Sequence, residues 1–312
     1  VHNPSTREKL KQAMIRLKYE ELFVYMTKIN FLKIKHKKED NGIKKEYDEE
    51  KLNEVISSLP YSLTDDQNKV LGEILDDLKS KRRMNRLLQG DVGSGKTVIS
   101  ILALYANYLS GFQGALMVPT EILAVQHFNT VKDILKDTGI KVELLVGSLS
   151  KKEKVSIHER LLNNDIDLVI GTHALIQEDV MYSNLGLVVT DEQHRFGVLQ
   201  RTKLQNKGNM PDVLYMSATP IPRTYALTIY GDMDISTIVS LPNGRKPIKT
   251  YLKSNKEMKE VLKMMYNELL ANHQIYVIAP LIEDSDTLDL ATVDELKDKM
   301  NLAFGDKYNI DV

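Results

Sequence analysis

The feature of this sequence that most restricts its fold is a glycine-rich segment that ends in lysine and threonine. The segment reads Gly90-Asp91-Val92-Gly93-Ser94-Gly95-Lys96-Thr97. It matches G-x-x-x-x-G-K-[ST] at every fixed position, and it lies between a short stretch that we expect to be a strand (86–89) and a longer apolar stretch of helical character (98–109). The pattern needs a strand before the loop and a helix after it, because the loop N–H groups must surround an anion at the helix start. The sequence therefore predicts an α/β domain built around this strand–loop–helix unit.

The same segment predicts a binding site for the phosphates of a nucleoside triphosphate. We expect all of its residues, Gly90 to Thr97, to contact the nucleotide, with Lys96 on the β- and γ-phosphate oxygens and the Thr97 hydroxyl on Mg²⁺. A guanine-specific site would need Asn-Lys-x-Asp, and none of the Asn-Lys pairs in the chain is followed by Asp at that spacing. The sequence thus gives no sign of a guanine-nucleotide switch.

Short apolar stretches alternate with helical ones from Tyr61 onward. The expected strands are Arg86–Gln89, Gly114–Val118, Val142–Val146, Asp167–Gly171, Leu185–Thr190 and Val213–Ser217. Most are continuous apolar runs, which is typical of strands that are buried on both faces of a parallel sheet. The alternation predicts a doubly wound parallel sheet whose ligands bind at the carboxyl ends of the strands.

An acidic pair, Asp191 and Glu192, directly follows the strand expected at Leu185–Thr190. An aspartate at the end of such a strand can hold Mg²⁺ through water, and the adjacent glutamate can accept a proton from an attacking water. Acidic pairs are common on protein surfaces, so the pair gains its meaning from the phosphate loop upstream. Together, the two motifs predict a hydrolase rather than a kinase.

Composition excludes several classes of protein. The chain is 42% hydrophobic and 27% charged, which is not the composition of a disordered chain, and it contains no cysteine for disulfides, thiolate zinc sites or cysteine nucleophiles. The net charge of −1 requires any nucleic-acid surface to be a local patch. The longest apolar stretch (98–109) is too short to span a bilayer, and the start does not resemble a signal peptide, so we expect a cytoplasmic protein.

The 312 residues are enough for about two domains. We expect one long helix up to about residue 38, begun by a capping box of Ser5 and Glu8, and then a charged linker. The basic end of that helix could contact DNA phosphates or simply face solvent. The expected division is a helical lead-in and linker (1–58), a first lobe (59–241) and a hinge with an incomplete second α/β lobe (242–312).

The incomplete second lobe should begin with a helix at about 255–272 and a strand at Gln274–Ala279. Because the chain has no initiator methionine and ends before such a lobe could close, we expect it to be a piece of a longer protein.

Beyond these patterns, the sequence resembles the superfamily 2 helicases over nearly its whole length. Leu63-Thr64-Asp65-Asp66-Gln67 resembles their adenine-reading Q-type motif, and Pro119-Thr120-Glu121-Ile122-Leu123-Ala124 resembles motif Ia. Further segments similar to DNA-contact motifs are Gly147-Ser148 and Gly171-Thr172-His173. Asp191-Glu192-Gln193-His194-Arg195-Phe196-Gly197 is similar to motif II, and Ser217-Ala218-Thr219-Pro220-Ile221-Pro222-Arg223-Thr224 to motif III, of the RecG-type branched-DNA helicases.

The resemblance implies a P-loop NTPase lobe of RecA-like fold and assigns roles to single residues. Gln67 would read adenine, while Tyr61 would either stack on the base or cover the core. His194 would link the γ-phosphate site to the motif III hydroxyls of Ser217 and Thr219, unless it is simply a buried histidine. The side chains that would contact DNA phosphates are those of Thr120, Ser148 and Thr172.

The activity that the resemblance implies is that of a DNA helicase or translocase powered by ATP and Mg²⁺, which we expect to act as a monomer on branched or duplex DNA in recombination and repair. Two alternatives stay open: a transcription-repair coupling translocase, and a nucleotide-gated DNA-binding switch with little turnover. By the same resemblance, a wedge domain should precede the chain, and motifs IV to VI with the arginine finger should follow Val312. We therefore expect residues 1–312 alone to be almost inactive.

Overall fold

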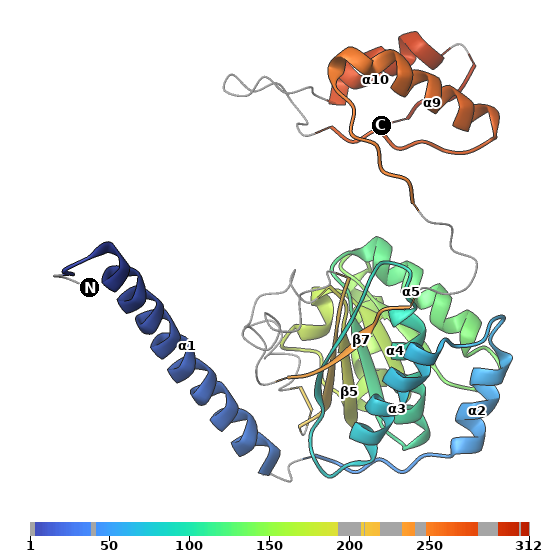
Figure 1. Ribbon diagram of the computed structural model, residues 1–312. Helices are drawn as coiled ribbons and strands as arrows, with labels where there is room; N and C mark the ends of the chain where they lie inside the picture. Colours follow the sequence, from blue (N-terminus) through green and yellow to red (C-terminus); the bar gives the residue numbers. More distant parts are fainter. Residues whose placement is uncertain are drawn as a thin grey trace. The chain divides into compact units, whose positions relative to one another are not determined.

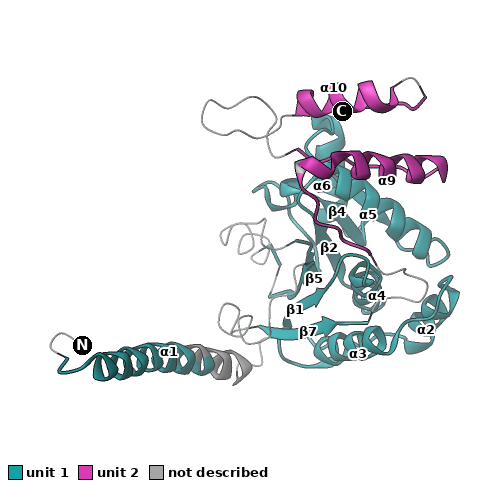
Figure 2. Cartoon of the chain, turned by 45° about the horizontal axis from the view of Figure 1, so that its top comes forward, with its two compact units in different colours: residues 1–245 teal, residues 246–312 magenta. Residues whose placement is uncertain are grey.

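A computed structural model describes residues 4–38, 42–192, 207–208, 210–218, 233–240, 248–279, 293–305 and 307–311. The chain forms two compact units, Val1–Arg245 and Lys246–Val312 (Figure 2). Within the described residues, no helix is both long enough and apolar enough to cross a membrane.

The first unit contains a twisted parallel sheet (Figure 1). In the described part of the chain its strands are β1 (Asn85–Gly90), β2 (Gln113–Met117), β3 (Val142–Leu145), β4 (Leu168–Gly171), β5 (Leu185–Thr190), β6 (Asp212–Ser217) and β7 (Asp234–Ile238). They lie in the order β3-β4-β2-β5-β6-β1-β7, and every pair of neighbours is parallel. The predicted doubly wound, RecA-like architecture is confirmed.

Each of the six predicted strands is present, with ends within one residue of those expected. The sequence did not reveal β7, because three of its five residues (Asp234, Ser236 and Thr237) are polar and it contains no apolar run. Ser236 in this edge strand is buried because its hydroxyl donates to Glu73 and it accepts a hydrogen bond from Arg86 Nη1 at 2.8 Å. A polar strand was therefore stabilised by partners that lie far away in sequence.

Helices cover both faces of the sheet. Helices α2 (Glu49–Ser58), α3 (Asp65–Lys79), α4 (Lys96–Leu109) and α5 (Glu121–Ile134) share one core cluster, whereas α6 (Lys151–Leu162) and the 3₁₀ helix η1 (His173–Ile176) contribute to another. Neighbouring residues of β2 point to opposite faces and contribute to different clusters. Leu116 belongs to the first cluster, and Ala115 and Met117 belong to the second. This alternation follows from the two-residue period of a strand.

The expected linker before the lobe is wrong for residues 42–58, which form part of the lobe. Asp48 caps α2 by accepting hydrogen bonds from the backbone of the first turn, and α2 buries Leu52 and Val55 in the core. Ahead of it, Lys45 is buried and bonded to Asp212. The stretch looked like a linker because only a narrow stripe of a short, charged helix is apolar.

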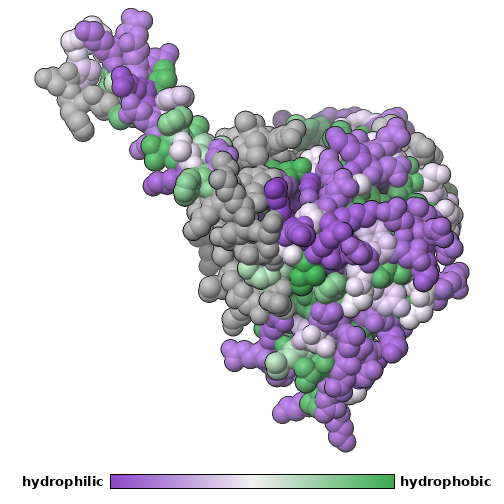
Figure 3. Space-filling model, turned by 90° about the horizontal axis from the view of Figure 1, so that it is seen from below, coloured by the Kyte–Doolittle hydropathy of each residue, from purple (hydrophilic) through white to green (hydrophobic). Residues whose placement is uncertain are grey.

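Helix α1 (Arg7–Lys38) confirms the long N-terminal helix, but its cap differs from the expected one. The Thr6 hydroxyl accepts from the backbone of Lys9 at 3.2 Å, so the cap is Thr6 and the box of Ser5 and Glu8 is wrong by one residue. Apolar side chains are exposed along α1 among hydrophilic ones (Figure 3); they include Met14, Leu17, Leu22 and Phe23.

The second unit contains η3 (Asn255–Glu257), α9 (Met258–Leu270) and α10 (Val293–Phe304) in its described part. The helix expected at about 255–272 is confirmed. The strand expected at Gln274–Ala279 is wrong, because this segment has no strand structure. A strand requires a neighbour for its backbone hydrogen bonds, and the described residues of this unit provide none.

Candidate functional site

Three neighbouring strands bring the predicted nucleotide-binding residues to one edge of the sheet. The register pairs Gln89 of β1 with Ser217 of β6, and Tyr215 of β6 with Thr190 of β5. Because the strands are parallel, the loop after β1, Ser217, and the Asp191-Glu192 pair after β5 all leave the sheet at its carboxyl edge. The sheet thus gathers residues that are more than one hundred positions apart in the sequence.

Glycine is needed at two positions of the phosphate loop for different reasons. Gly95, the residue before α4, has φ of 89°, and a Cβ there would overlap the Gln67 amide. Gly90 lies so close to Ser94 that a Cβ would overlap the serine hydroxyl. The Ser94 hydroxyl is itself buried with no hydrogen-bond partner among the described residues. A tight loop with free donors at the start of a buried helix fits a phosphate group.

The Lys96 side chain bends back over its own loop. Its ammonium group donates to the carbonyl oxygens of Gly90 at 2.7 Å and Asp91 at 2.9 Å, and the residue is buried. Burial lowers the pKa of Lys96, whereas the carboxylates of Asp191, Glu192 and Asp91 act in the opposite direction. A cation near three carboxylates and the loop is suited to bind phosphate oxygens.

The acidic pair is held by backbone contacts. Asp191 donates its N–H to the Met117 carbonyl at 2.9 Å, and its Oδ1 accepts from the N–H of Glu192 at 2.9 Å. Glu192 has φ of 49°, in the left-handed region that a glutamate rarely adopts. Strain of this kind is often found at functional sites, and here it fixes where the Glu192 side chain leaves the chain.

The donor set suits Mg²⁺ better than a metal that requires a full protein cage. The described residues contain no group of three or more His, Cys, Asp or Glu side chains that could hold a metal ion. Mg²⁺ usually binds through one or two protein oxygens together with phosphate oxygens and waters. Thr97, in the first turn of α4, and Asp191 therefore fit the expected ion, and their role in binding it stays a prediction.

Gln67 already has protein partners. It is buried, its Oε1 accepts from the backbone of Thr64 at 2.8 Å, and its Nε2 donates to the Ser94 carbonyl at 2.8 Å. These bonds tie the start of α3 to the phosphate loop, and the adenine contact stays a prediction. Tyr61 is half exposed, so its ring is accessible to a base, and its stacking role is likewise untested.

Of the predicted coupling residues, Ser217 is buried at the end of β6. His194 and Thr219 lie outside the described residues, as does Arg223.

The predicted DNA contacts lie on the other half of the same edge. Thr120 follows β2, Ser148 follows β3 and Thr172 follows β4, and these strands are adjacent in the sheet. Thr120 caps α5 by accepting from the N–H of Leu123 at 3.3 Å. The N–H of Ser148 donates to Glu121 Oε1 at 3.1 Å, and hydrogen bonds from the Ser148 side chain and backbone lower the pKa of Glu121.

The sequence analysis missed His127, which lies in α5 and reaches the nucleotide half of the edge. Its Nε2 lies 3.1 Å from Asp191 Oδ2. A histidine inside an ordinary amphipathic helix carries no signal on its own. It could have been found only with the knowledge that β2, which precedes α5, pairs with β5.

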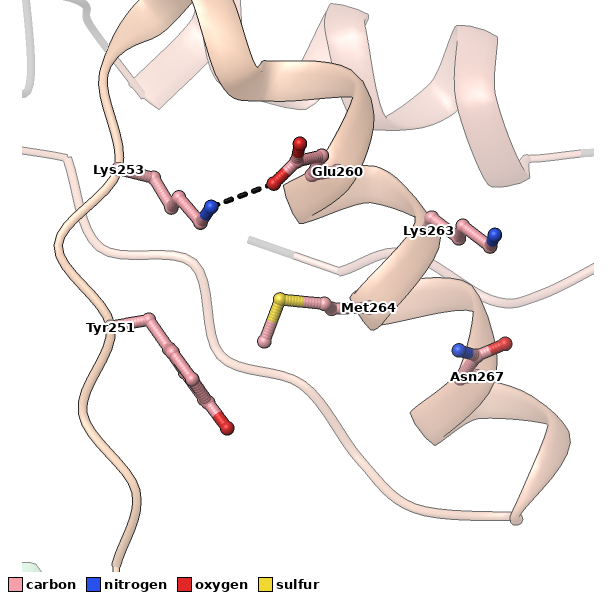
Figure 4. Close-up of a pocket in the computed structure, with 6 residues that line it drawn as sticks. All are labelled: Tyr251, Lys253, Glu260, Lys263, Met264 and Asn267. Carbon is pink, nitrogen blue, oxygen red and sulfur yellow. Dashed lines mark hydrogen bonds and ion pairs between the residues drawn. The ribbon is translucent and has the colours of Figure 1, made fainter.

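A pocket in the second unit contains none of the predicted site residues (Figure 4). It is lined by Tyr251, Lys253, Glu260, Lys263, Met264 and Asn267. Lys253 donates to Glu257 at 3.0 Å and to Glu260 at 2.6 Å, so its charge is already neutralised within the unit.

Comparison with known proteins agrees with this geometry. A family model described as DEAD/DEAH box helicase matches residues 64–228. The ATP-dependent DNA helicase RecG of Bacillus subtilis (strain 168) is 47% identical over 99% of this chain, and RecG of Thermotoga maritima is 48% identical over 95%. A solved structure of RecG bound to a three-way DNA junction is 44% identical over 96% of the chain, with a TM-score of 0.81.

These relatives confirm the predicted resemblance to RecG-type helicases. The chain spans 46% of the length of the Bacillus subtilis relative, 38% of the Thermotoga maritima relative and 39% of the chain in the junction complex. The match therefore concerns somewhat less than half of each relative.

Proposed function

Because this chain belongs to the DEAD/DEAH box helicase family, we propose that it forms the ATP-binding motor lobe of a RecG-type helicase that remodels branched DNA. The observation that carries the proposal is the single sheet edge, which has the phosphate loop and the acidic pair on one half and the predicted DNA contacts on the other. ATP use follows from the family, and branched DNA is proposed because the similar RecG structure contains a three-way junction.

In this proposal, each residue on the nucleotide half of the edge has one task in hydrolysis. Lys96 binds the β- and γ-phosphate oxygens, and Thr97 and Asp191 would hold Mg²⁺, which when bound neutralises charge on those oxygens. Glu192 orients a water and accepts its proton as the water oxygen attacks the γ-phosphorus. The bond from the γ-phosphorus to the bridging oxygen then breaks, which yields ADP and phosphate.

On the other half, Thr120, Ser148 and Thr172 contact phosphates of a DNA strand. Hydroxyl and backbone N–H donors suit this task, because phosphate contacts position a protein on DNA without reading its sequence. His194, Ser217 and Thr219 would transmit the state of the γ-phosphate to these contacts. We further propose that the protein acts as a monomer in recombination and repair, and that it is cytoplasmic, because the similar RecG proteins come from bacteria, whose chromosome lies in that compartment.

The proposal is tested by measuring ATP hydrolysis by the full-length protein without DNA, with linear duplex and with a synthetic three-way junction. We expect the junction to stimulate turnover more than a duplex of equal length does. The Lys96→Ala variant, purified and assayed in parallel, shows how much of the ATP hydrolysis comes from a contaminating enzyme. Turnover that is indifferent to DNA would contradict the motor and favour a nucleotide-gated switch.

A further inference from the structure

We infer that His127 is a positioning residue that holds the Asp191 carboxylate and thereby connects the DNA-contacting end of α5 to the metal site. This inference rests on the proposed function, since it assumes that Asp191 helps to hold Mg²⁺ and that the start of α5 contacts DNA.

The contact between His127 and Asp191 is specific in its geometry. His127 Nε2 and Asp191 Oδ2 are 3.1 Å apart, and the two side chains are only 9% and 15% exposed. An ionised carboxylate can only accept, so Nε2 must carry the hydrogen. The other carboxylate oxygen accepts from the N–H of Glu192 at 2.9 Å. Both oxygens of Asp191 therefore have fixed partners, which determines the directions left for a cation.

The ring of His127 does not gain stability from both of its nitrogens. Its second ring nitrogen, Nδ1, is buried and has no hydrogen-bond partner among the described residues. An unpaired buried polar atom disfavours folding, so an apolar side chain would serve the core better at this position. Within the described part of the chain, the polar partner of the His127 ring is the Asp191 carboxylate. Residues that orient a metal ligand in this manner commonly affect metal affinity strongly.

Helix α5 joins this contact to the other half of the sheet edge. Its first residue, Glu121, accepts from the backbone of Ser148, and its cap, Thr120, follows β2 directly. Ala124 and Val131, on either side of His127, are fully buried in the core. Thr120 and His127 are seven positions apart, which is about 10 Å along a helix. A displacement of the helix start by DNA would thus move the imidazole that holds Asp191.

The experiment uses the full-length protein with three variants at position 127 and one control. His127→Leu removes the hydrogen bond, His127→Gln restores a donor near the position of Nε2, and His127→Asn is polar but too short to reach Asp191. The matched control is His158→Leu. His158 is also mostly buried, lies 3.5 Å from an aspartate (Asp179) and has one unpartnered ring nitrogen, but it lies in α6 and has no predicted role.

The first measurement is the binding of fluorescent ADP as Mg²⁺ is titrated, without DNA. For His127→Leu and His127→Asn we expect the Mg²⁺ concentration at half-saturation to rise about tenfold, the lower end of typical effects of residues that orient metal ligands. His127→Gln should stay within about threefold of wild type. Binding in EDTA should change less than about twofold in every variant, because the phosphate loop is intact.

The second measurement is ATP hydrolysis at saturating Mg²⁺, with and without three-way junction DNA. We expect His127→Leu to lose most of the stimulation by DNA while the Kd for the junction stays that of wild type. His127→Gln should regain the stimulation, and His158→Leu should match wild type in both measurements.

Several outcomes would overturn the inference. If the Mg²⁺ curves of His127→Leu and His127→Asn overlay those of wild type, His127 does not position Asp191. A shifted Mg²⁺ curve with full DNA stimulation would refute the connection through α5. If His127→Leu does not fold, the comparison of Gln with Asn decides. Failure of the proposed function is seen separately, as a wild-type enzyme that DNA does not stimulate, while the Mg²⁺ titration still tests His127.

Discussion

Glu192 combines an unusual backbone with the chemistry of a general base. The backbone of Glu192 has φ of 49°, and its N–H donates to the carboxylate of the preceding residue, Asp191. Glu192→Gln should keep the shape and the hydrogen-bonded backbone but lose the ability to accept a proton. In the full-length protein we expect ATP affinity close to that of wild type and turnover reduced by at least about 100-fold, since general-base catalysis contributes about 10² to 10⁴. Equilibrium binding measures the ATP affinity, and single-turnover hydrolysis measures the rate of the chemical step. Wild-type turnover in this variant would show that another residue is the general base.

At Lys96 the prediction is the opposite: binding, rather than the chemical step, should fail. The ammonium is buried beside the loop and bonded to two of its carbonyl oxygens, so it is ready to exchange them for phosphate oxygens. Lys96→Ala should weaken ATP binding by at least about 100-fold, since charge-assisted hydrogen bonds to two phosphates are lost. Isothermal titration with ATP and Mg²⁺ measures the effect. An unchanged Kd would show that the phosphate site has been wrongly assigned.

Among the elements, the segment before α2 is anchored by one buried ion pair. Lys45 is 1% exposed, and it bonds to Asp212 of β6 and to the Gly186 carbonyl of β5 at 3.0 Å. Asp212 also accepts from the N–H of Met84 at 2.6 Å. Burial raises the pKa of Asp212, and the Lys45 charge opposes that rise. The pair thus fastens the segment that follows α1 to the edge of the sheet opposite the nucleotide loop.

Removal of Lys45 would leave Asp212 buried without its cation. We expect Lys45→Ala to lower the free energy of unfolding by about 3–5 kcal/mol, measured by urea denaturation followed by circular dichroism. The control is Lys44→Ala, because Lys44 is half exposed and pairs with Glu46 at the surface, where an ion pair contributes about 0–1 kcal/mol. Equal losses in the two variants would contradict the anchoring role of Lys45.

At the scale of the whole molecule, the proposed motor needs a positive charge that stabilises the transition state, and the second unit of residues 1–312 does not supply it as an arginine. Residues 246–312 contain no arginine. In motors of the proposed kind, an arginine from a second lobe stabilises the transition state and contributes about 10³ to 10⁵ in rate. We expect residues 1–312 alone to hydrolyse ATP at least about 100-fold more slowly than the full-length protein with junction DNA. Steady-state rates within tenfold of each other would show that the catalytic charge lies within this chain.

Much of the nucleotide half of the site could be predicted because its information is local. The loop from Gly90 to Thr97 needs glycines for its own backbone, and the apolar runs of β5 and β6 reflect burial on both faces. A motif that follows a buried strand can therefore be placed at the carboxyl edge of the sheet from sequence alone. The family resemblance added the assignment of roles, and two of the residues concerned, His194 and Thr219, lie outside the described residues.

Only the tertiary structure decided the contacts between residues that are distant in the chain. The polar strand β7 is stabilised by hydrogen bonds to Glu73 and Arg86. Lys45 can be buried because its ammonium group forms an ion pair with Asp212. His127 gains its meaning from the pairing of β2 with β5, which places it beside Asp191. The physical reason is the same in each case. A polar group can be buried only with a partner, and the sequence pattern near that group does not say which partner the fold will bring to it.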